Sequence, residues 1–328
     1  MKNRKYEFDY LKALCIISVI VTHCPFNEQS RKLVFFPFFV EMAVPIFIVI
    51  SGYMQCHSIV NSHSIKLYYS KKLKKNILKV IAPYLFVIFV EFVWFVIFKD
   101  VMSTRCFFTQ LLKDGAIGPG GYYTIIYLQL LVVFPLLFWL YRVAPKSVII
   151  GGVAVCVLLE VLCNHFVSDE VYRLLFVRYL PFALCGIILF DKRYNMKKIQ
   201  LYSIISLLFI YLLAYTGYTP HIFRRWSGST LPTAPYALLL TSLFIRYMPR
   251  VGHFLDRLLS EIGKSTYYIF LVQMLWFAIG LGSFTSDLKT VIPVNLVICL
   301  SAGIAFKNML LFIEEKIGQV HKIMIDRL

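Results

Sequence analysis

Two titratable side chains, Lys12 and His23, lie eleven residues apart in the first hydrophobic segment, which reads LKALCIISVIVTHC. Eleven residues at about 100° each make three helical turns plus about 20°, so a helix places both side chains on one face. A rise of about 1.5 Å per residue separates them by roughly 16 Å, about half the hydrocarbon thickness of a membrane. Such residues are costly in a membrane helix and commonly functional. Alternatively, Lys12 extends to the headgroups and His23 lies at the outer interface.

A carboxylate stands at a comparable depth in the second hydrophobic segment. Glu41 opens the run EMAVPIFIVISGYM, and a carboxylate beside a histidine fixes its tautomer and raises its basicity. Glu41 is therefore a candidate partner for His23. Pro45 and the pair Ser51–Gly52 interrupt this segment. They indicate either a polar cavity beside the first helix or a kink with close packing of small residues.

Five lysines precede the third hydrophobic segment, in the run SKKLKKNILK: Lys71, Lys72, Lys74, Lys75 and Lys79. Lysine is a point-charge partner for phosphates, so the run is a candidate phosphate-binding patch. The alternative is that these charges set the membrane orientation and attract anionic lipid. Further along the chain, Glu91 and Glu160 are expected to pair with Arg173 or Arg178 inside the bundle.

The composition predicts an all-α, polytopic membrane protein. The chain has 328 residues, of which 59% are hydrophobic, and its mean hydropathy is +0.73. At about 20 residues a span, about ten transmembrane helices fit. No polar block is long enough to be a soluble domain, so residues 1–328 are expected to form a single membrane domain. We predict spans at about 10–25, 33–55, 77–98, 122–141, 147–165, 171–190, 199–216, 232–248, 265–283 and 289–312.

The net charge of +17 could suggest a nucleic-acid ligand, but its distribution argues against one. With the N-terminus inside, 23 of the 34 basic residues fall in cytoplasmic stretches, eight fall outside and three lie within spans. The positive-inside rule predicts this asymmetry for ten helices with both termini cytoplasmic. The outer connections 99–121 and 217–231 contain Gly and Pro, and they are re-entrant, lid-like or ordinary loops.

The eight cysteines show no metal-ligand spacing. Most lie within apolar runs, where cysteine behaves as a small hydrophobic residue. We therefore predict no metal site.

Together, these segments resemble the bacterial membrane acyltransferase 3 family. FDYLKALCIISVIVTHC is similar to the opening pattern of the family, VPIFIVISGYM to its Ser-Gly element, and KKLKKNILKVIAPYLF to its basic run before a Pro-Tyr. Weaker similarities follow in GGYYTIIYLQLLVVFPLL, RYLPFALCGIIL and IGKSTYYIFLVQMLW. The strong similarity covers about residues 5–86, and the weaker similarity reaches residue 275.

The resemblance implies a ten-helix enzyme that moves an acyl group, often acetyl, from cytoplasmic acyl-CoA to a sugar hydroxyl of an extracytoplasmic or lipid-linked polysaccharide. His23 takes the place of the essential histidine of the family and is expected to act as general base. The expected catalytic residues are His23, Glu41 and Ser51, with either Ser51 or a backbone amide of the interrupted second helix stabilising the oxyanion. The expected acyl-CoA-binding residues are Lys12, Lys71, Lys72, Lys75 and Arg178.

The expected partners are acyl-CoA as donor substrate, a surface polysaccharide or lipid-linked glycan as acceptor, and membrane lipids, with no permanently bound cofactor. The expected location is the bacterial cytoplasmic (inner) membrane, with multiple passes. Two residues depart from the family pattern. Lys12 replaces an arginine and loses its bidentate fork, and Gln273 stands where many members have histidine. Asp9 is expected to form an i, i+3 ion pair with Lys12.

Two other functions fit the buried titratable residues. A proton-coupled transporter or exporter of a polysaccharide or small molecule also needs histidine, glutamate and arginine within its spans. A non-catalytic membrane sensor or partner subunit is a third possibility, and it would tolerate replacement of His23.

Overall fold

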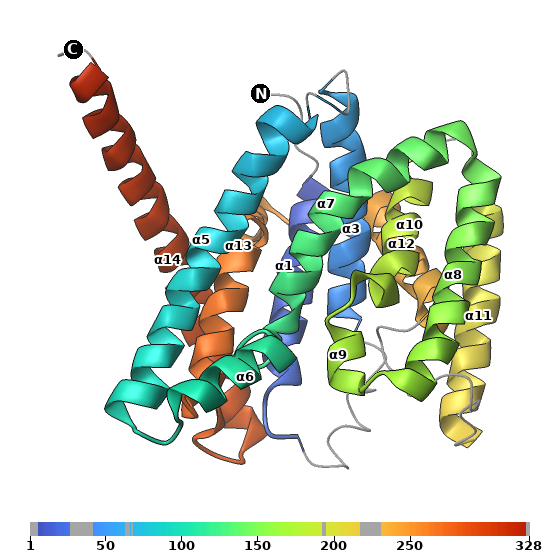
Figure 1. The fold of residues 1–328 in the computed structure, drawn as a ribbon. Coiled ribbons are helices and arrows are strands. Elements are labelled where there is room, and N and C mark those ends of the chain that lie inside the picture. Colours follow the sequence, from blue (N-terminus) through green and yellow to red (C-terminus); the bar gives the residue numbers. More distant parts are fainter. Residues whose placement is uncertain are drawn as a thin grey trace.

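The computed structural model describes residues 6–26, 42–62, 66, 68–191, 195–216 and 231–325. Every regular element in these ranges is a helix, which confirms the all-α prediction (Figure 1). The elements are α1 (Tyr6–Thr22), α3 (Ala43–Val60), η1 (Tyr68–Leu73), α5 (Lys74–Phe92), η2 (Val93–Phe98), α6 (Thr104–Asp114), α7 (Tyr122–Val143), α8 (Pro145–Phe166), α9 (Asp169–Arg173), η3 (Phe176–Tyr179), α10 (Leu180–Phe190), α11 (Met196–Thr216), η4 (Leu231–Thr233), α12 (Ala234–Tyr247), α13 (His253–Ala278), η5 (Leu281–Ser283) and α14 (Leu288–Ile325).

Several helices have the length and apolar composition that a membrane crossing needs. Each of the ten predicted spans overlaps at least one described helix. Five helical stretches of the described chain meet the requirement on their own: Ala43–Val60, Lys74–Phe98, Tyr122–Val143, Pro145–Cys163 and Leu288–Lys316. The protein is therefore a multi-pass membrane protein, and the count of ten crossings stays a prediction.

The start of α1 and the end of α14 lie at the same end of the bundle, at the top of Figure 1. We call this end the upper end and the opposite one the lower end. An even number of crossings requires this arrangement. That the upper end faces the cytoplasm stays a prediction.

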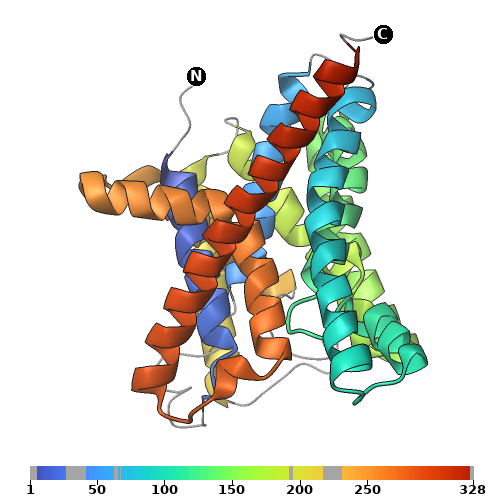
Figure 2. The same ribbon diagram turned by 90° about the vertical axis from the view of Figure 1, so that its left-hand side faces the viewer.

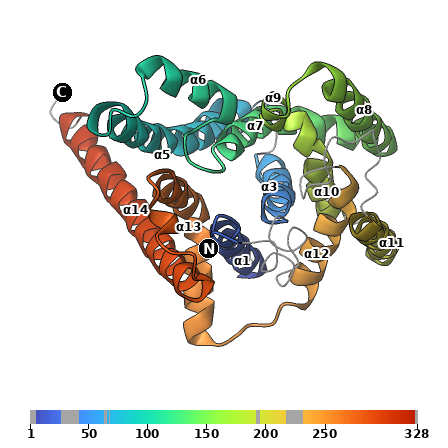
Figure 3. The ribbon, with the colours of Figure 1, turned by 90° about the horizontal axis from the view of Figure 1, so that it is seen from below.

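Helix α1 lies in the interior of the bundle together with α3. Figure 3 shows both helices surrounded by α5, α7, α10, α12, α13 and α14. Helix α1 packs against α13 and α3, and α3 packs against α10. Fully buried side chains such as Ile16, Ile20, Ile48 and Val49 form this part of the core. The charged residues of α1 are therefore shielded from lipid by other helices, as their desolvation cost requires.

The eight cysteines are consistent with the structural role predicted for them. None forms a disulfide, and all except Cys106 are buried. Within the described chain, no group of three or more His, Cys, Asp and Glu side chains is placed to hold a metal ion.

Helix α3 begins at Ala43, so Pro45 lies in its first turn, and the helix is continuous through Ser51–Gly52, where the sequence predicted an interruption. A Cβ atom on Gly52 would lie 3.0 Å from the carbonyl oxygen of Ala183, and one on Gly186 would lie 2.9 Å from the Cα atom of Gly52. The two glycines thus allow α3 and α10 to approach closely. An interruption at Ser51–Gly52 was a wrong prediction, whereas the expected close packing of small residues is confirmed.

We predict that Gly186→Ala lowers the stability of the protein by about 1–3 kcal/mol, because the added methyl group overpacks the contact between α3 and α10. The measurement is thermal unfolding of the purified protein in detergent. Gly151→Ala on α8 is the matched control, since a Cβ atom there would meet nothing within 4 Å. The control should unfold at the native temperature or slightly above it, because alanine favours a helix by about 1 kcal/mol over glycine. Equal melting temperatures for the two variants would contradict the prediction.

Candidate functional site

A cavity of about 450 Å³ lies between α1, α3, α5, α7 and α13. Its polar lining comes from α1, α3, α5 and α13 and includes Lys12, Ser51, Gln55, Ser58, Asn76, Lys79 and Thr266. A cavity therefore lies beside the first helix, although its lining is more apolar than polar. The cavity brings together Lys12 and Ser51, two of the predicted site residues.

The cavity is long and changes in polarity along its length. On α3 its lining extends from Val44 to Ser58, which is about 21 Å at 1.5 Å per residue. The polar residues Ser58 and Lys79 lie toward the upper end, where α5 begins, while Val44 and Val19 line the lower part (Figure 1). This shape suits an extended molecule with a charged upper end and an apolar lower part.

Lys12 contributes a cation to the wall of the cavity. Its Nζ atom lies 3.9 Å from Oδ1 of Asp9, and the side chains are 20% and 3% exposed, respectively. The predicted i, i+3 ion pair is thus confirmed. Because the carboxylate of Asp9 is buried, it lowers the cost of keeping a cation inside the bundle.

Ser51 lies in the middle part of the cavity and faces an aromatic wall. Tyr53, two residues after Ser51 on α3, packs against Phe8 of α1 with the ring centroids 4.7 Å apart. Ser51 therefore lies nearer to the level of Lys12 than to that of His23. The structure does not bring Ser51 and His23 together. A role for Ser51 in stabilising the oxyanion stays a prediction.

His23 lies just below the cavity, in the turn that follows α1. It is four residues after Val19, which lines the lower part of the cavity, so the two side chains share one face of the chain. The half-buried imidazole has its ring centroid 5.7 Å from that of Phe277. His23 is not itself a lining residue, and only about one helical turn separates it from the cavity.

Asn295 organises a polar cluster beside His23 that the sequence analysis missed. Its Nδ2 atom donates to the carbonyl oxygen of Gly282 at 2.8 Å and lies 3.6 Å from Sγ of Cys24, the neighbour of His23. Its Oδ1 atom accepts a hydrogen bond from Nε1 of Trp276 at 2.8 Å. Asn295 is fully buried. An asparagine within the apolar run VIPVNLVICL was the available signal, because such a residue needs partners inside the bundle.

The lysine run is placed at the upper end, as predicted, but its members differ in role. Lys72 donates to the carbonyl oxygen of Ser58 at 3.1 Å, and Lys75 is exposed. Lys79, which the expected donor site omitted, lines the cavity. The spacing of Lys72, Asn76 and Lys79 was the signal, since residues i, i+4 and i+7 share a helix face. Two predicted site residues are not placed: Glu41 lies outside the described residues, and so does the side chain of Lys71.

Arg178 lies in a different cluster from the lysines and does not line the cavity. Its guanidinium group lies over the ring of Tyr172, 5.4 Å from the centroid. The hydroxyl of Tyr172 donates to the carboxylate of Glu160 at 2.7 Å. Arg173 forms its ion pair with Asp114, at 3.3 Å, rather than with a glutamate as predicted.

Glu91 holds a buried glycine-rich loop, residues 115–121, instead of the arginine that we predicted as its partner. Its carboxylate accepts hydrogen bonds from the backbone amides of Ile117, at 3.1 Å, and Gly118, at 3.0 Å. The hydroxyl of Tyr84 donates to the carbonyl oxygen of Gly115. Nε2 of Gln273 donates to the carbonyl oxygen of Pro119 at 3.3 Å. The outer connection 99–121 is thus helix α6 followed by a loop that turns into the bundle.

We predict that Glu91→Leu destabilises the protein, because it leaves two buried backbone amides without acceptors. The cost is about 1–3 kcal/mol for each amide. Thermal unfolding in detergent measures it. Glu91→Gln keeps one side-chain oxygen as an acceptor and should lose much less. A Glu91→Leu variant that melts at the native temperature would show that Glu91 does not hold the loop.

The comparison with known families agrees with this geometry. A family model described as an acyltransferase domain, that of the acyltransferase 3 family, matches residues 5–306. The match includes α1, the lysine run and all of the helices that line the cavity. No curated protein and no solved structure matches the chain.

Proposed function

The chain belongs to the acyltransferase 3 family, and we propose that it transfers an acyl group, expected to be acetyl, from cytoplasmic acyl-CoA to a sugar hydroxyl. The acceptor is an extracytoplasmic or lipid-linked polysaccharide. Family membership makes the chain a membrane acyltransferase. The donor, the acceptor and the roles of individual residues are the proposal.

The observation that carries the proposal is the cavity between the lysine run and the level just above His23. Acyl-CoA combines a phosphate-rich nucleotide, a long flexible arm and a thioester at its far end. In the proposal, the phosphates bind the cations at the upper end, Lys72, Lys75 and Lys79. The arm extends down the cavity past Lys12 and Ser51, and the thioester reaches the apolar lower part.

The chemistry proposed for the lower part requires His23 in its neutral form. The imidazole of His23 removes the proton from a sugar hydroxyl, and the hydroxyl oxygen attacks the thioester carbonyl carbon. The carbon–sulfur bond then breaks, and the leaving thiolate takes the proton from the imidazolium. This produces the sugar ester and free coenzyme A. Glu41 keeps its proposed role of orienting the imidazole.

The residues of the cavity suggest separate roles for Ser51 and Arg178. Because Ser51 lines the cavity and His23 does not, we assign Ser51 to contact with the donor arm rather than with the oxyanion. Arg178 stands outside the cavity, over Tyr172, and its contribution to donor binding stays a prediction.

We predict that His23→Ala lowers acyl transfer by at least 10²-fold, the usual lower bound for loss of a general base. The assay is release of free coenzyme A by the purified protein, given acetyl-CoA and an oligosaccharide acceptor. Binding of acetyl-CoA should persist, because His23 does not line the cavity.

The matched control is His165→Ala, which removes an exposed histidine near the end of α8. It should transfer acyl groups at the native rate. A His23→Ala variant that keeps native activity would refute the role of the base.

We predict that Lys79→Gln raises the KM for acetyl-CoA about 3- to 10-fold and changes kcat little, because uniform binding energy is lost. One exposed charge–phosphate contact is worth about 1 kcal/mol, and this sets the range. Lys146→Gln, which changes an exposed lysine at the upper end near the start of α8, is the control. The proposed donor path fails if both variants shift KM equally or neither does.

A further inference from the structure

A second cavity, of about 670 Å³, lies at the upper end of the bundle, on the other side of α1. It is lined by Tyr6 and Tyr10 of α1 and by residues around the start of α13, including Arg250, His253, Asp256 and Arg257. Tyr10 is two residues before Lys12, so the two side chains point about 160° apart on the helix. The second cavity is thus distinct from the central one.

The first part of α13 has the pattern of a helix that lies in a membrane interface. Polar and apolar residues alternate in pairs between residues 253 and 261, so one face carries Phe254, Leu255 and Leu258 and the other carries Asp256 and Arg257. Figures 2 and 3 show this part lying across the bundle axis and projecting sideways. Phe254 is 78% exposed. Such a helix buries its apolar face among acyl chains and presents its polar face to headgroups.

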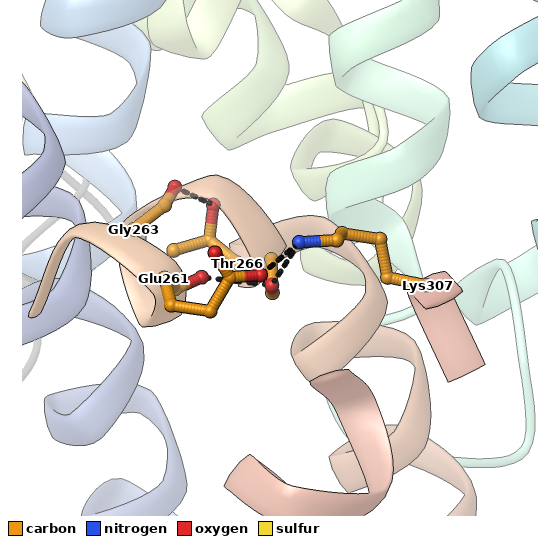
Figure 4. A network of polar contacts seen from close by, with 5 residues as sticks. Glu261, Gly263, Thr266 and Lys307 are labelled. Atoms are coloured by element: carbon orange, nitrogen blue, oxygen red, sulfur yellow. Dashed lines mark hydrogen bonds and ion pairs between the residues drawn. The ribbon is translucent and has the colours of Figure 1, made fainter. Parts of the chain in front are cut away.

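A set of contacts fixes the bend where α13 turns from this orientation into the bundle. Nζ of Lys307, on α14, contacts the carboxylate of Glu261 and lies 3.1 Å from Oγ of Ser265 (Figure 4). The hydroxyl of Thr266 donates to the carbonyl oxygen of Gly263 at 3.3 Å. A Cβ atom on Gly263 would clash with the backbone of Asp9. The interfacial part of α13 is therefore held firmly against α1.

The polar groups of the second cavity leave an excess of positive charge. Asp256 already accepts hydrogen bonds from the hydroxyl of Tyr10 and from the backbone amide of Val251, at 3.0 Å. The Tyr10 hydrogen bond and the nearby Arg250 and His253 hold the pKa of Asp256 below its usual value, so it stays ionised. Among the described residues, no carboxylate forms an ion pair with Arg250 or Arg257 within 4.0 Å.

Arg250 is held in position without a carboxylate. Its guanidinium group lies over the ring of Tyr6, 5.0 Å from the centroid, and the hydroxyl of Tyr6 donates to the carbonyl oxygen of Met248 at 3.2 Å. A stacked guanidinium keeps its N–H donors free at the edge of its plane. This arrangement suits a phosphate, which accepts two parallel hydrogen bonds from arginine.

We propose that this second cavity binds the phosphate of an anionic phospholipid headgroup, with Arg250 and Arg257 as its ligands. Phe254 lines this cavity, and Leu258 is one turn further along α13. Both side chains are exposed, so they favour a lipid, which would bury them among its acyl chains, over a soluble phosphate. The inference is independent of the acyl-transfer chemistry, since it uses no residue of the central cavity.

The test is native mass spectrometry of the full chain in non-ionic detergent, with phosphatidylglycerol or phosphatidylcholine added. The native protein should retain phosphatidylglycerol in preference to phosphatidylcholine. The double variant Arg250→Gln, Arg257→Gln should retain at least fivefold less phosphatidylglycerol. The matched control, Lys197→Gln with Lys198→Gln, removes two exposed cations at the start of α11 and should retain the native amount.

Three results would overturn the proposal: equal retention by the two double variants, equal retention of the two lipids by the native protein, or capture of inorganic phosphate without retention of lipid. Asp256→Asn is a second test, which keeps the proposal falsifiable if the double variant does not fold. It removes the opposing negative charge but keeps an acceptor oxygen for Tyr10, so retention of phosphatidylglycerol should rise about twofold, on the scale of one partly screened charge. A fall below the native level would also refute the site.

Discussion

The cost of placing charge in hydrocarbon, about 2.5–3.5 kcal/mol for a single ionised side chain at the centre of a helix on insertion scales, determines where α1 lies. This helix carries the ion pair of Asp9 and Lys12, and His23 follows it directly. Other helices enclose α1 (Figure 3). The central cavity lies along the face of α1 that carries Lys12. The same constraint explains the loop at 115–121. Its backbone lies inside the bundle, where Glu91, Tyr84 and Gln273 provide the partners that lipid cannot.

The sequence was sufficient to predict what depends on local patterns. Hydropathy located the helices, and the i, i+3 spacing predicted the ion pair of Asp9 and Lys12. Lys12 lies in the wall of the cavity, and His23 lies in the turn beyond the end of α1. Partners from distant segments could not be predicted, because nothing local specifies them. Glu91 binds amides more than twenty residues away, and Asn295 lies beside Cys24. The depth of Ser51 also depended on the packing of α3 against α1 and α7.

The two cavities at the upper end of the molecule suit two different ligands, an acyl donor and a membrane lipid. The central cavity begins near Lys79 and descends toward His23, which suits a long donor that delivers its reactive end near the opposite side of the bundle. The second cavity lies beside the interfacial part of α13 and combines free guanidinium groups with exposed apolar side chains. The bend of α13 lies between the two cavities, because Ser260 lines the second cavity and Thr266 lines the central one. The contact of Lys307 with Glu261 holds this bend in place.

Mass spectrometry of surface glycans tests the central claim most directly, that the chain transfers an acyl group to an extracytoplasmic carbohydrate. Glycans would be compared between cells with the gene, cells without it and cells in which it is restored. The account predicts that one ester-linked acyl group is lost with the gene and returns with it, on a defined sugar. Identical glycans in all three strains would contradict it.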